Sequence, residues 1–186
     1  MRPNVQPTVT PNRQPPKVHP PTVTPSRAPF GDDAKVEIAY ENRVLNVSGK
    51  CVYCSLETLG RHYGFDQLKA LSVERYGSGP RQIKKVLDAY GLQQGSDYKL
   101  QPHGACDLKL IQEATSTGTY FAVGINGNHM LVCCGYGDYG ALIMDNSGPG
   151  AGWVKRWSKQ KFHQHWDGMA VMLCPKNRRP QVVVVT

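Results

Sequence analysis

Three short stretches of the sequence carry the residue types that thiol chemistry requires. Cys51 follows a turn residue, Gly49, and opens a stretch with the apolar spacing of a helix. His129 begins an apolar run that is typical of a strand, and Asp145 and Asn146 stand side by side where the next such run ends. A cysteine, a histidine and a carboxylate or amide, far apart and in this order, indicate a nucleophilic cysteine with its base and the group that orients the base.

The position predicted for Cys51 favours its thiolate form. The first turn of a helix has backbone N–H groups without intrahelical partners and carries the positive end of the helix dipole. Both features stabilise a thiolate more than a thiol, so the pKa of Cys51 is expected to fall. In this hypothesis His129 takes the thiol proton and returns it to the leaving group. Asn146 or Asp145 holds the imidazole in the productive tautomer.

Around these residues the sequence predicts mostly helices before Thr119 and mostly strands from Thr119 on. Apolar spacing predicts helices over 51–63, 66–76, 80–90, 107–114 and 158–166. Alternating or continuous apolar runs predict strands over 36–40, 97–100, 120–125, 129–136, 141–145, 153–157 and 168–174. This order is typical of an α+β fold in which the helix of Cys51 packs on a C-terminal antiparallel sheet. Glu57, on the same helix, is expected to lie in solvent.

Proline content and charge set the two ends of the chain apart from its middle. Residues 1–30 hold nine of the fourteen prolines and a repeat, in which Pro7–Arg13 recurs as Pro21–Arg27. So many prolines exclude helix and ladder pairing and predict an extended arm. Residues 1–30 carry a charge of +4 and residues 175–186 carry +3, so the formal total of +8 leaves only +1 for residues 31–174.

We therefore divide the chain into a basic proline-rich arm (1–33), one globular domain (34–174) and a basic tail (175–186). The arm is predicted to be either a flexible linker or a segment that docks on an acidic or groove-bearing protein assembly. Because the globular part has almost no excess charge, nucleic acid is expected to be contacted, if at all, through the tails only. The sequence shows no apolar run of membrane-spanning length and no secretory signal, which predicts no membrane partner and a protein of the cytoplasm or of a particle.

The six cysteines raise the alternative of a metal or redox site. Cys51 and Cys54 have the spacing of a dithiol or of half a zinc site. The other half would have to come from Cys133 and Cys134, whose adjacency gives poor ligand geometry. We therefore predict no metal and no cofactor, and interpret Cys54 and the remaining cysteines as small buried apolar residues.

The three motifs together resemble those of papain-like cysteine peptidases. Gly-Lys-Cys-Val-Tyr-Cys-Ser at 49–55 is similar to Gly-Ser-Cys-Trp-Ala-Phe-Ser of that family. Asn-His-Met-Leu-Val at 128–132, followed by Gly-Tyr-Gly at 135–137, resembles the family's Asn-His-Ala-Val and Gly-Tyr-Gly hairpin. Asn-Ser at 146–147 resembles the start of Asn-Ser-Trp-Gly. The helix at 51–64 is also similar to that of bacteriocin-leader peptidases, compact bacterial members of the superfamily, and the resemblance covers residues 35–174.

This resemblance implies a papain-like fold and hydrolysis of a peptide or isopeptide bond in a protein or peptide substrate. Cys51 would be the nucleophile and His129 the base. The third member stays open: the Asn-Ser match favours Asn146, to which the interpretation leans. The one-for-one count from His129 through the hairpin, and the leader peptidases' use of Asp, favour Asp145. For the oxyanion the resemblance implies the backbone N–H of Cys51 and a second donor, for which Asn46 is the candidate.

One departure from the family keeps a second function open. Papain-like peptidases place a glutamine six residues before the nucleophile, and Leu45 occupies that position here. Without a donor beside the Cys51 N–H, the acceleration from that donor is lost. The alternative is a catalytically inactive papain-like module that serves as a structural or binding component of a larger assembly, a virion for example, docked by its proline-rich arm. A related amidase or acyl-transferase would differ only in leaving group and acceptor.

Overall fold

A computed structural model describes residues 38–47, 49–73, 79–147 and 153–175 of the chain. The predicted arm over 1–33 lies outside the described residues, as does the predicted basic tail apart from its first residue, Pro175. The division into arm, domain and tail therefore stays a prediction.

Most helices of the described chain precede Thr119 and most strands follow it, as the sequence predicts. The helices are α1 (Cys51–Tyr63), α2 (Pro80–Ala89), α3 (Leu108–Ser116) and α4 (Lys159–His165). The strands are β1 (Tyr98–Gln101), β2 (Phe121–Ile125), β3 (His129–Gly137), β4 (Gly140–Asp145), β5 (Trp153–Trp157) and β6 (Trp166–Leu173). Three short 3₁₀ turns are η1 (Tyr40–Asn42), η2 (Asp66–Leu68) and η3 (Leu71–Val73). The predicted α+β class is confirmed.

Two predicted elements differ from the structure. The helix expected over 66–76 is two 3₁₀ turns, η2 and η3, within its described part. The N–H of Ser72, which a continuous helix would direct to the carbonyl of Leu68, donates to Glu57 Oε2 instead. The strand expected over 36–40 is wrong where it is described, since Ile38 is buried while Tyr40 is 65% exposed and begins η1.

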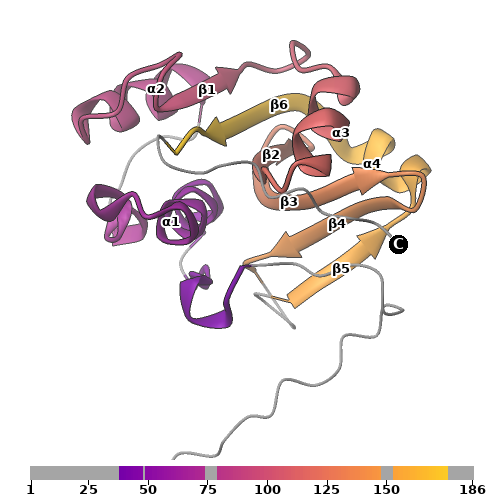
Figure 1. The fold of residues 1–186 in the computed structure, drawn as a ribbon, viewed down its shortest axis with the longest axis horizontal. Helices are drawn as coiled ribbons and strands as arrows, with labels where there is room; N and C mark the ends of the chain where they lie inside the picture. Colours follow the sequence, from indigo (N-terminus) through magenta and orange to yellow (C-terminus); the bar gives the residue numbers. More distant parts are fainter. Residues whose placement is uncertain (1–37, 48, 74–78, 148–152, 176–186) are drawn as a thin grey trace, which may run out of the picture. The chain divides into compact units, whose positions relative to one another are not determined.

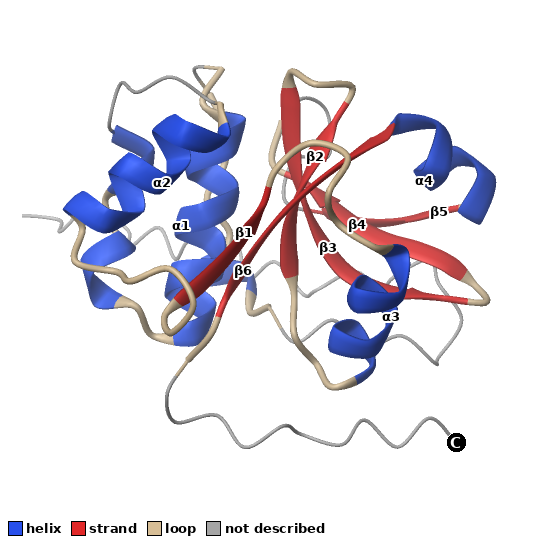
Figure 2. Ribbon diagram, turned by 90° about the horizontal axis from the view of Figure 1, so that it is seen from above, coloured by secondary structure: helices blue, strands red, loops and turns tan. Residues whose placement is uncertain are grey.

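The six strands form one antiparallel sheet in the order β1-β6-β2-β3-β4-β5. Helices α1 and α2 lie on one side of this sheet and α3 and α4 on the other (Figures 1 and 2). Because successive residues of a strand point to opposite faces, β3 divides its side chains between the two sides. Met130, Val132 and Cys134 join the buried cluster under α1, and Leu131 and Cys133 join the cluster under α3 and α4.

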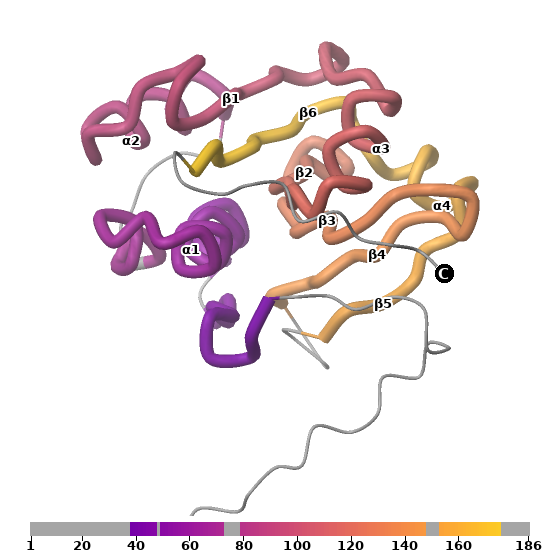
Figure 3. The backbone as a smooth tube through the Cα atoms, viewed as in Figure 1, coloured from indigo at the N-terminus to yellow at the C-terminus, as the bar shows by residue number. Residues whose placement is uncertain are grey.

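Helix α1 is the element that the first side of the sheet is built around. Its residues 51–60 are all buried, and it ends at Gly64, which adopts the left-handed conformation with φ 75°. The chain enters α1 from residues 38–47, which lie between the helix and the ends of β4 and β5 (Figure 3). The N–H of Val44 donates to Thr58 Oγ1 at 3.0 Å, which ties this segment to the helix.

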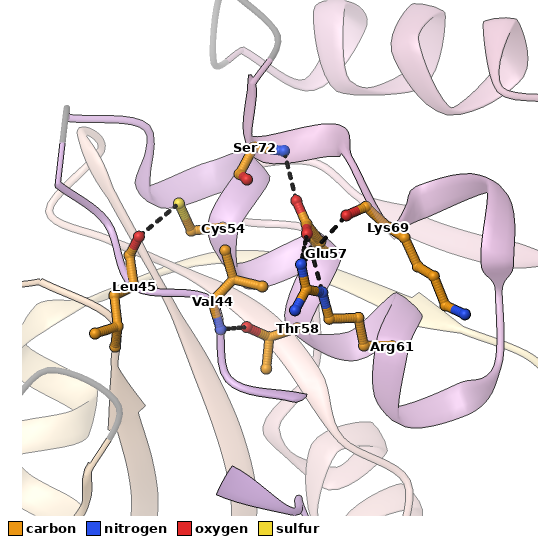
Figure 4. A network of polar contacts seen from close by, with 8 residues as sticks. All are labelled: Val44, Leu45, Cys54, Glu57, Thr58, Arg61, Lys69 and Ser72. Carbon is orange, nitrogen blue, oxygen red and sulfur yellow. Dashed lines mark hydrogen bonds and ion pairs between the residues drawn. The ribbon is translucent and has the colours of Figure 1, made fainter. Parts of the chain in front are cut away.

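A buried carboxylate fastens α1 to the following turns. Glu57 is only 1% exposed, contrary to its expected place in solvent. Its Oε1 forms an ion pair with Arg61, and its Oε2 accepts a hydrogen bond from the N–H of Ser72 at 2.7 Å (Figure 4). Arg61 also donates to the carbonyl of Lys69 at 3.3 Å. The carboxylate thus connects two turns of α1 with η3.

We expect Glu57→Ala to lower the free energy of unfolding by about 3 kcal/mol, because it leaves a guanidinium and a buried N–H without their acceptor. Urea denaturation followed by circular dichroism measures this loss. The matched control is Lys84→Ala, which removes the exposed ion pair between Lys84 and Asp88 and should cost about 0.5 kcal/mol or less. Equal losses for both variants would show that Glu57 does not fasten the helix.

Candidate active site

Cys51 is the first residue of α1, where the sequence predicts it. Gly49 has φ 73°, and no atom would lie within 4 Å of a Cβ at this position, so the backbone conformation is what favours glycine. The side-chain carbonyl of Asn46 accepts a hydrogen bond from the N–H of Lys50 at 2.7 Å and closes the loop. The turn therefore delivers the thiol to the N-terminal end of the helix.

Cys51 and His129 form a hydrogen-bonded pair. Burial alone would raise the pKa of Cys51, but the hydrogen bond from His129 and its positive charge, with the backbone N–H groups of Met130 and Val52, bring this pKa below its ordinary value. The pKa of His129 is raised, first by its hydrogen bond to Cys51 and further by the negative charge of Asp145. Both shifts favour a thiolate beside an imidazolium, the reactive form of a cysteine nucleophile.

The structure brings Asp145, not Asn146, to the histidine. Asp145 is the last residue of β4, and its Oδ1 lies 3.4 Å from Nε2 of His129. The same oxygen accepts a hydrogen bond from the N–H of Ser147 at 2.8 Å. Asn146 is fully buried, and its Nδ2 lies 3.5 Å from Ser55 Oγ on α1. The leaning toward Asn146 therefore does not agree with the contacts.

Asn46, the candidate oxyanion donor, lies between the loop of Cys51 and the end of β4. Its side-chain Nδ2 donates to Ser147 Oγ at 2.9 Å, and its backbone N–H donates to the carbonyl of Asn146 at 2.7 Å. The neighbouring Leu45 is 45% exposed and has no side-chain donor. Its carbonyl accepts a hydrogen bond from the thiol of Cys54 at 3.8 Å (Figure 4).

The other cysteines lie in environments unlike that of Cys51. All six are free thiols. Burial, with the charge of Glu57, raises the pKa of Cys54 to about 11, and burial raises that of Cys133 to about 12. Within the described ranges no group of three or more His, Cys, Asp or Glu residues is placed to hold a metal ion. In the same ranges, no helix combines the length and apolar character of a membrane span.

Two contacts of the site were not predicted from the sequence. The backbone N–H of Met130 contacts the sulfur of Cys51. The hydroxyl of Ser55 contacts Met130, next to His129, and Asn146, next to Asp145. A backbone contact across elements leaves no sequence signal. Ser55 does leave one, because a residue four positions after Cys51 lies on the same face of a helix.

Comparisons with known proteins give fold-level matches alone. Neither a protein family nor a curated protein matches the sequence. Among solved structures, the peptidase domain of Streptococcus ComA, a bifunctional ABC transporter of a quorum-sensing pathway, is 20% identical with a TM-score of 0.52, over 72% of this chain and 97% of that one. The chain has a papain-like peptidase fold. A double-glycine motif protease from an AMS/PCAT transporter, solved with a leader peptide, is 19% identical with a TM-score of 0.48, over 72% of this chain and 90% of that one.

The fold of the structure is the papain-like fold that the sequence motifs predict. At the level of the fold, the similarity to compact peptidase domains that the motif around Cys51 predicts is confirmed by the peptidase domain of ComA. In this papain-like domain the Cys helix α1 packs on the antiparallel sheet, and β3 and β4 bring His129 and Asp145 to its N-terminal end. At 20% identity the likeness carries the fold, and the chemistry has to be argued from the residues of this chain.

Proposed function

We propose that this domain is a cysteine peptidase that hydrolyses a peptide or isopeptide bond with Cys51 as nucleophile, His129 as general acid and base, and Asp145 as the group that orients the imidazole. The observation that carries the proposal is the hydrogen bond between Cys51 and His129, with the pKa of the thiol lowered and that of the imidazole raised. A buried structural cysteine has the opposite shift, as Cys54 and Cys133 show.

Each step of hydrolysis has a group of this chain to perform it. The thiolate of Cys51 attacks the carbonyl carbon and forms a tetrahedral intermediate. The imidazolium of His129 protonates the leaving amine as the C–N bond breaks, which leaves a thioester on Cys51. His129 then takes a proton from water, which attacks the thioester and releases the acid and the thiolate. Asp145 contacts Nε2 throughout, so Nδ1 is the nitrogen that serves the thiol.

The proposed oxyanion donors are the backbone N–H of Cys51 and the side-chain amide of Asn46. The first belongs to the opening turn of α1, whose N–H groups have no partner within the helix. The second is anchored by contacts with Lys50 and Ser147, at the loop that leads to Cys51. An anchored amide of this kind takes the place of the glutamine that Leu45 replaces.

A protein or peptide is the proposed substrate class. The solved domain of ComA is a peptidase, and thiolate attack on a carbonyl requires an acyl group as substrate. The alternative is still an inactive module that docks through residues 1–30 on a larger assembly such as a virion. The proposed location is the cytoplasm or a particle. Residues 1–30 lie outside the described residues. The interaction of Cys51 with His129 favours the enzyme over the inactive module.

A proteome-derived peptide mixture tests the proposal without a known substrate. We expect the full-length protein to generate new peptide ends, detected by mass spectrometry, with a rate that rises as Cys51 ionises and falls as His129 loses its proton. Because the pKa of Cys51 is lowered, the acid limb of the rate profile should lie at lower pH than the ionisation of an ordinary thiol. Because the pKa of His129 is raised, the alkaline limb should lie at higher pH than the deprotonation of an ordinary imidazole. Cys106→Ala, which removes a thiol outside the site, should cleave like the wild type. No new ends at any pH would favour the inactive module.

A further inference from the structure

A buried hydroxyl of α1 lies close to the nucleophile. Ser55 is fully buried on α1, one turn after Cys51 and on the same face of the helix. Its Oγ donates to the carbonyl of Met130 at 3.2 Å. The N–H of the same Met130 reaches the sulfur of Cys51. Two consecutive turns of α1 thus contact one residue of β3, the residue that follows His129.

The same hydroxyl also contacts the strand of the carboxylate. Nδ2 of Asn146 lies 3.5 Å from Ser55 Oγ, and Asn146 directly follows Asp145. Since the hydroxyl hydrogen is directed at Met130, its oxygen is the acceptor for the amide. Within the described residues, Oδ1 of Asn146 has no hydrogen-bond partner. A fully buried amide that is only partly satisfied costs stability, so packing alone does not account for it.

We propose that Ser55 and Asn146 are positioning residues, which fix the helix of Cys51 against the strands that carry His129 and Asp145. This inference rests on the proposed function. Apolar contacts between a helix and a sheet are non-directional and tolerate small shifts along the helix axis. The Ser55 hydroxyl donates to Met130 of β3 and accepts from Asn146, which follows β4, and these two hydrogen bonds fix a single register. In catalysis, a displacement of about 1 Å between reacting groups costs on the order of a hundredfold in rate.

The test uses alkylation of Cys51 by iodoacetamide, followed by mass spectrometry of its peptide, at a series of pH values. We expect Ser55→Ala and Asn146→Ala to raise the apparent pKa of Cys51 by about one unit, so that alkylation is slowed about tenfold at pH values below the wild-type plateau. Thr58→Val is the matched control: it removes another fully buried hydroxyl of α1, which contacts Val44 and neither strand. The control should be destabilised to a similar degree and keep the alkylation profile of the wild type.

The outcomes separate this inference from the proposed function. A Ser55→Ala protein that is folded and alkylates Cys51 like the wild type would overturn the positioning role and leave the peptidase proposal intact. An equal shift in Thr58→Val would overturn it as well, because general loosening of the helix would then be sufficient. A wild-type protein whose Cys51 reacts like an ordinary thiol would overturn the peptidase proposal first. If Ser55→Ala does not fold, Asn146→Ala decides by the same criteria.

Discussion

Replacing Cys51 with alanine is expected to reduce peptide hydrolysis by about 10⁴-fold or more, the largest effect of any substitution in this chain. Without the sulfur there is no thioester intermediate, and an alanine methyl group cannot replace it. The fold should be retained, since the side chain is small and lies at the helix end. The rate of appearance of new peptide ends, per mole of folded protein, is the measurement.

Cys54→Ala is the matched control for this prediction. Cys54 belongs to the same first turns of α1 and is also buried, but its thiol contacts the carbonyl of Leu45 and its pKa is raised to about 11. We expect this variant to keep hydrolysis close to that of the wild type. If it abolished hydrolysis while Cys51→Ala did not, the assignment of the nucleophile would be wrong.

The second largest effect is expected at Asp145. Asp145→Ala should lower kcat by about 10²- to 10⁴-fold, because the imidazole of His129 loses the contact that holds its Nε2. Asp145→Asn should recover much of this loss, since a side-chain carbonyl can still accept a hydrogen bond at that place. The recovery separates orientation of the ring from packing at the end of β4.

The Asp145→Asn variant also has a signed pH effect. The negative charge of Asp145 contributes to the raised pKa of His129, so its removal should lower that pKa. The alkaline limb of the rate profile then moves to lower pH, while the acid limb, set by Cys51, moves little. An unchanged alkaline limb in Asp145→Asn would contradict the assignment of Asp145 as the partner of His129.

Local patterns in the sequence were sufficient for the two main catalytic candidates. Cys51 is readable because a glycine turn precedes a run of helical spacing, and His129 because it opens an apolar strand. The α+β class follows from the same two periodicities. The two 3₁₀ turns in place of a helix over 66–76 were not readable, because the acceptor of the Ser72 N–H is Glu57 on α1, a tertiary contact.

The choice between Asp145 and Asn146 depends on a register that sequence does not show. An unbroken ladder from the pair of Gly137 and Gly140 would set Asp145 opposite Val132. The irregularity between Cys133 and Gly135 pairs Val132 with Met144 instead. A shift of one residue exchanges the two faces of a strand, so Asp145 comes to the face of His129, and Asn146 points toward α1.

Glu57 was mispredicted for a related reason. A charged residue on a helix is usually in solvent, and the burial of Glu57 depends on two donors, the guanidinium of Arg61 and the N–H of Ser72. Arg61 is one turn away on α1, but the N–H of Ser72 belongs to η3. Sequence spacing predicts the first contact and not the second.

The ion pair of Cys51 and His129 is tested by the rate of iodoacetamide alkylation of Cys51 between pH 4 and 9, in the wild-type protein and in His129→Ala. If thiolate and imidazolium form a pair, the wild type reacts rapidly well below neutral pH and keeps a plateau there. In His129→Ala the rate falls about tenfold for each pH unit below the ordinary thiol pKa. If in both proteins the alkylation rate rises only near the ordinary thiol pKa, Cys51 and His129 do not form a thiolate–imidazolium pair.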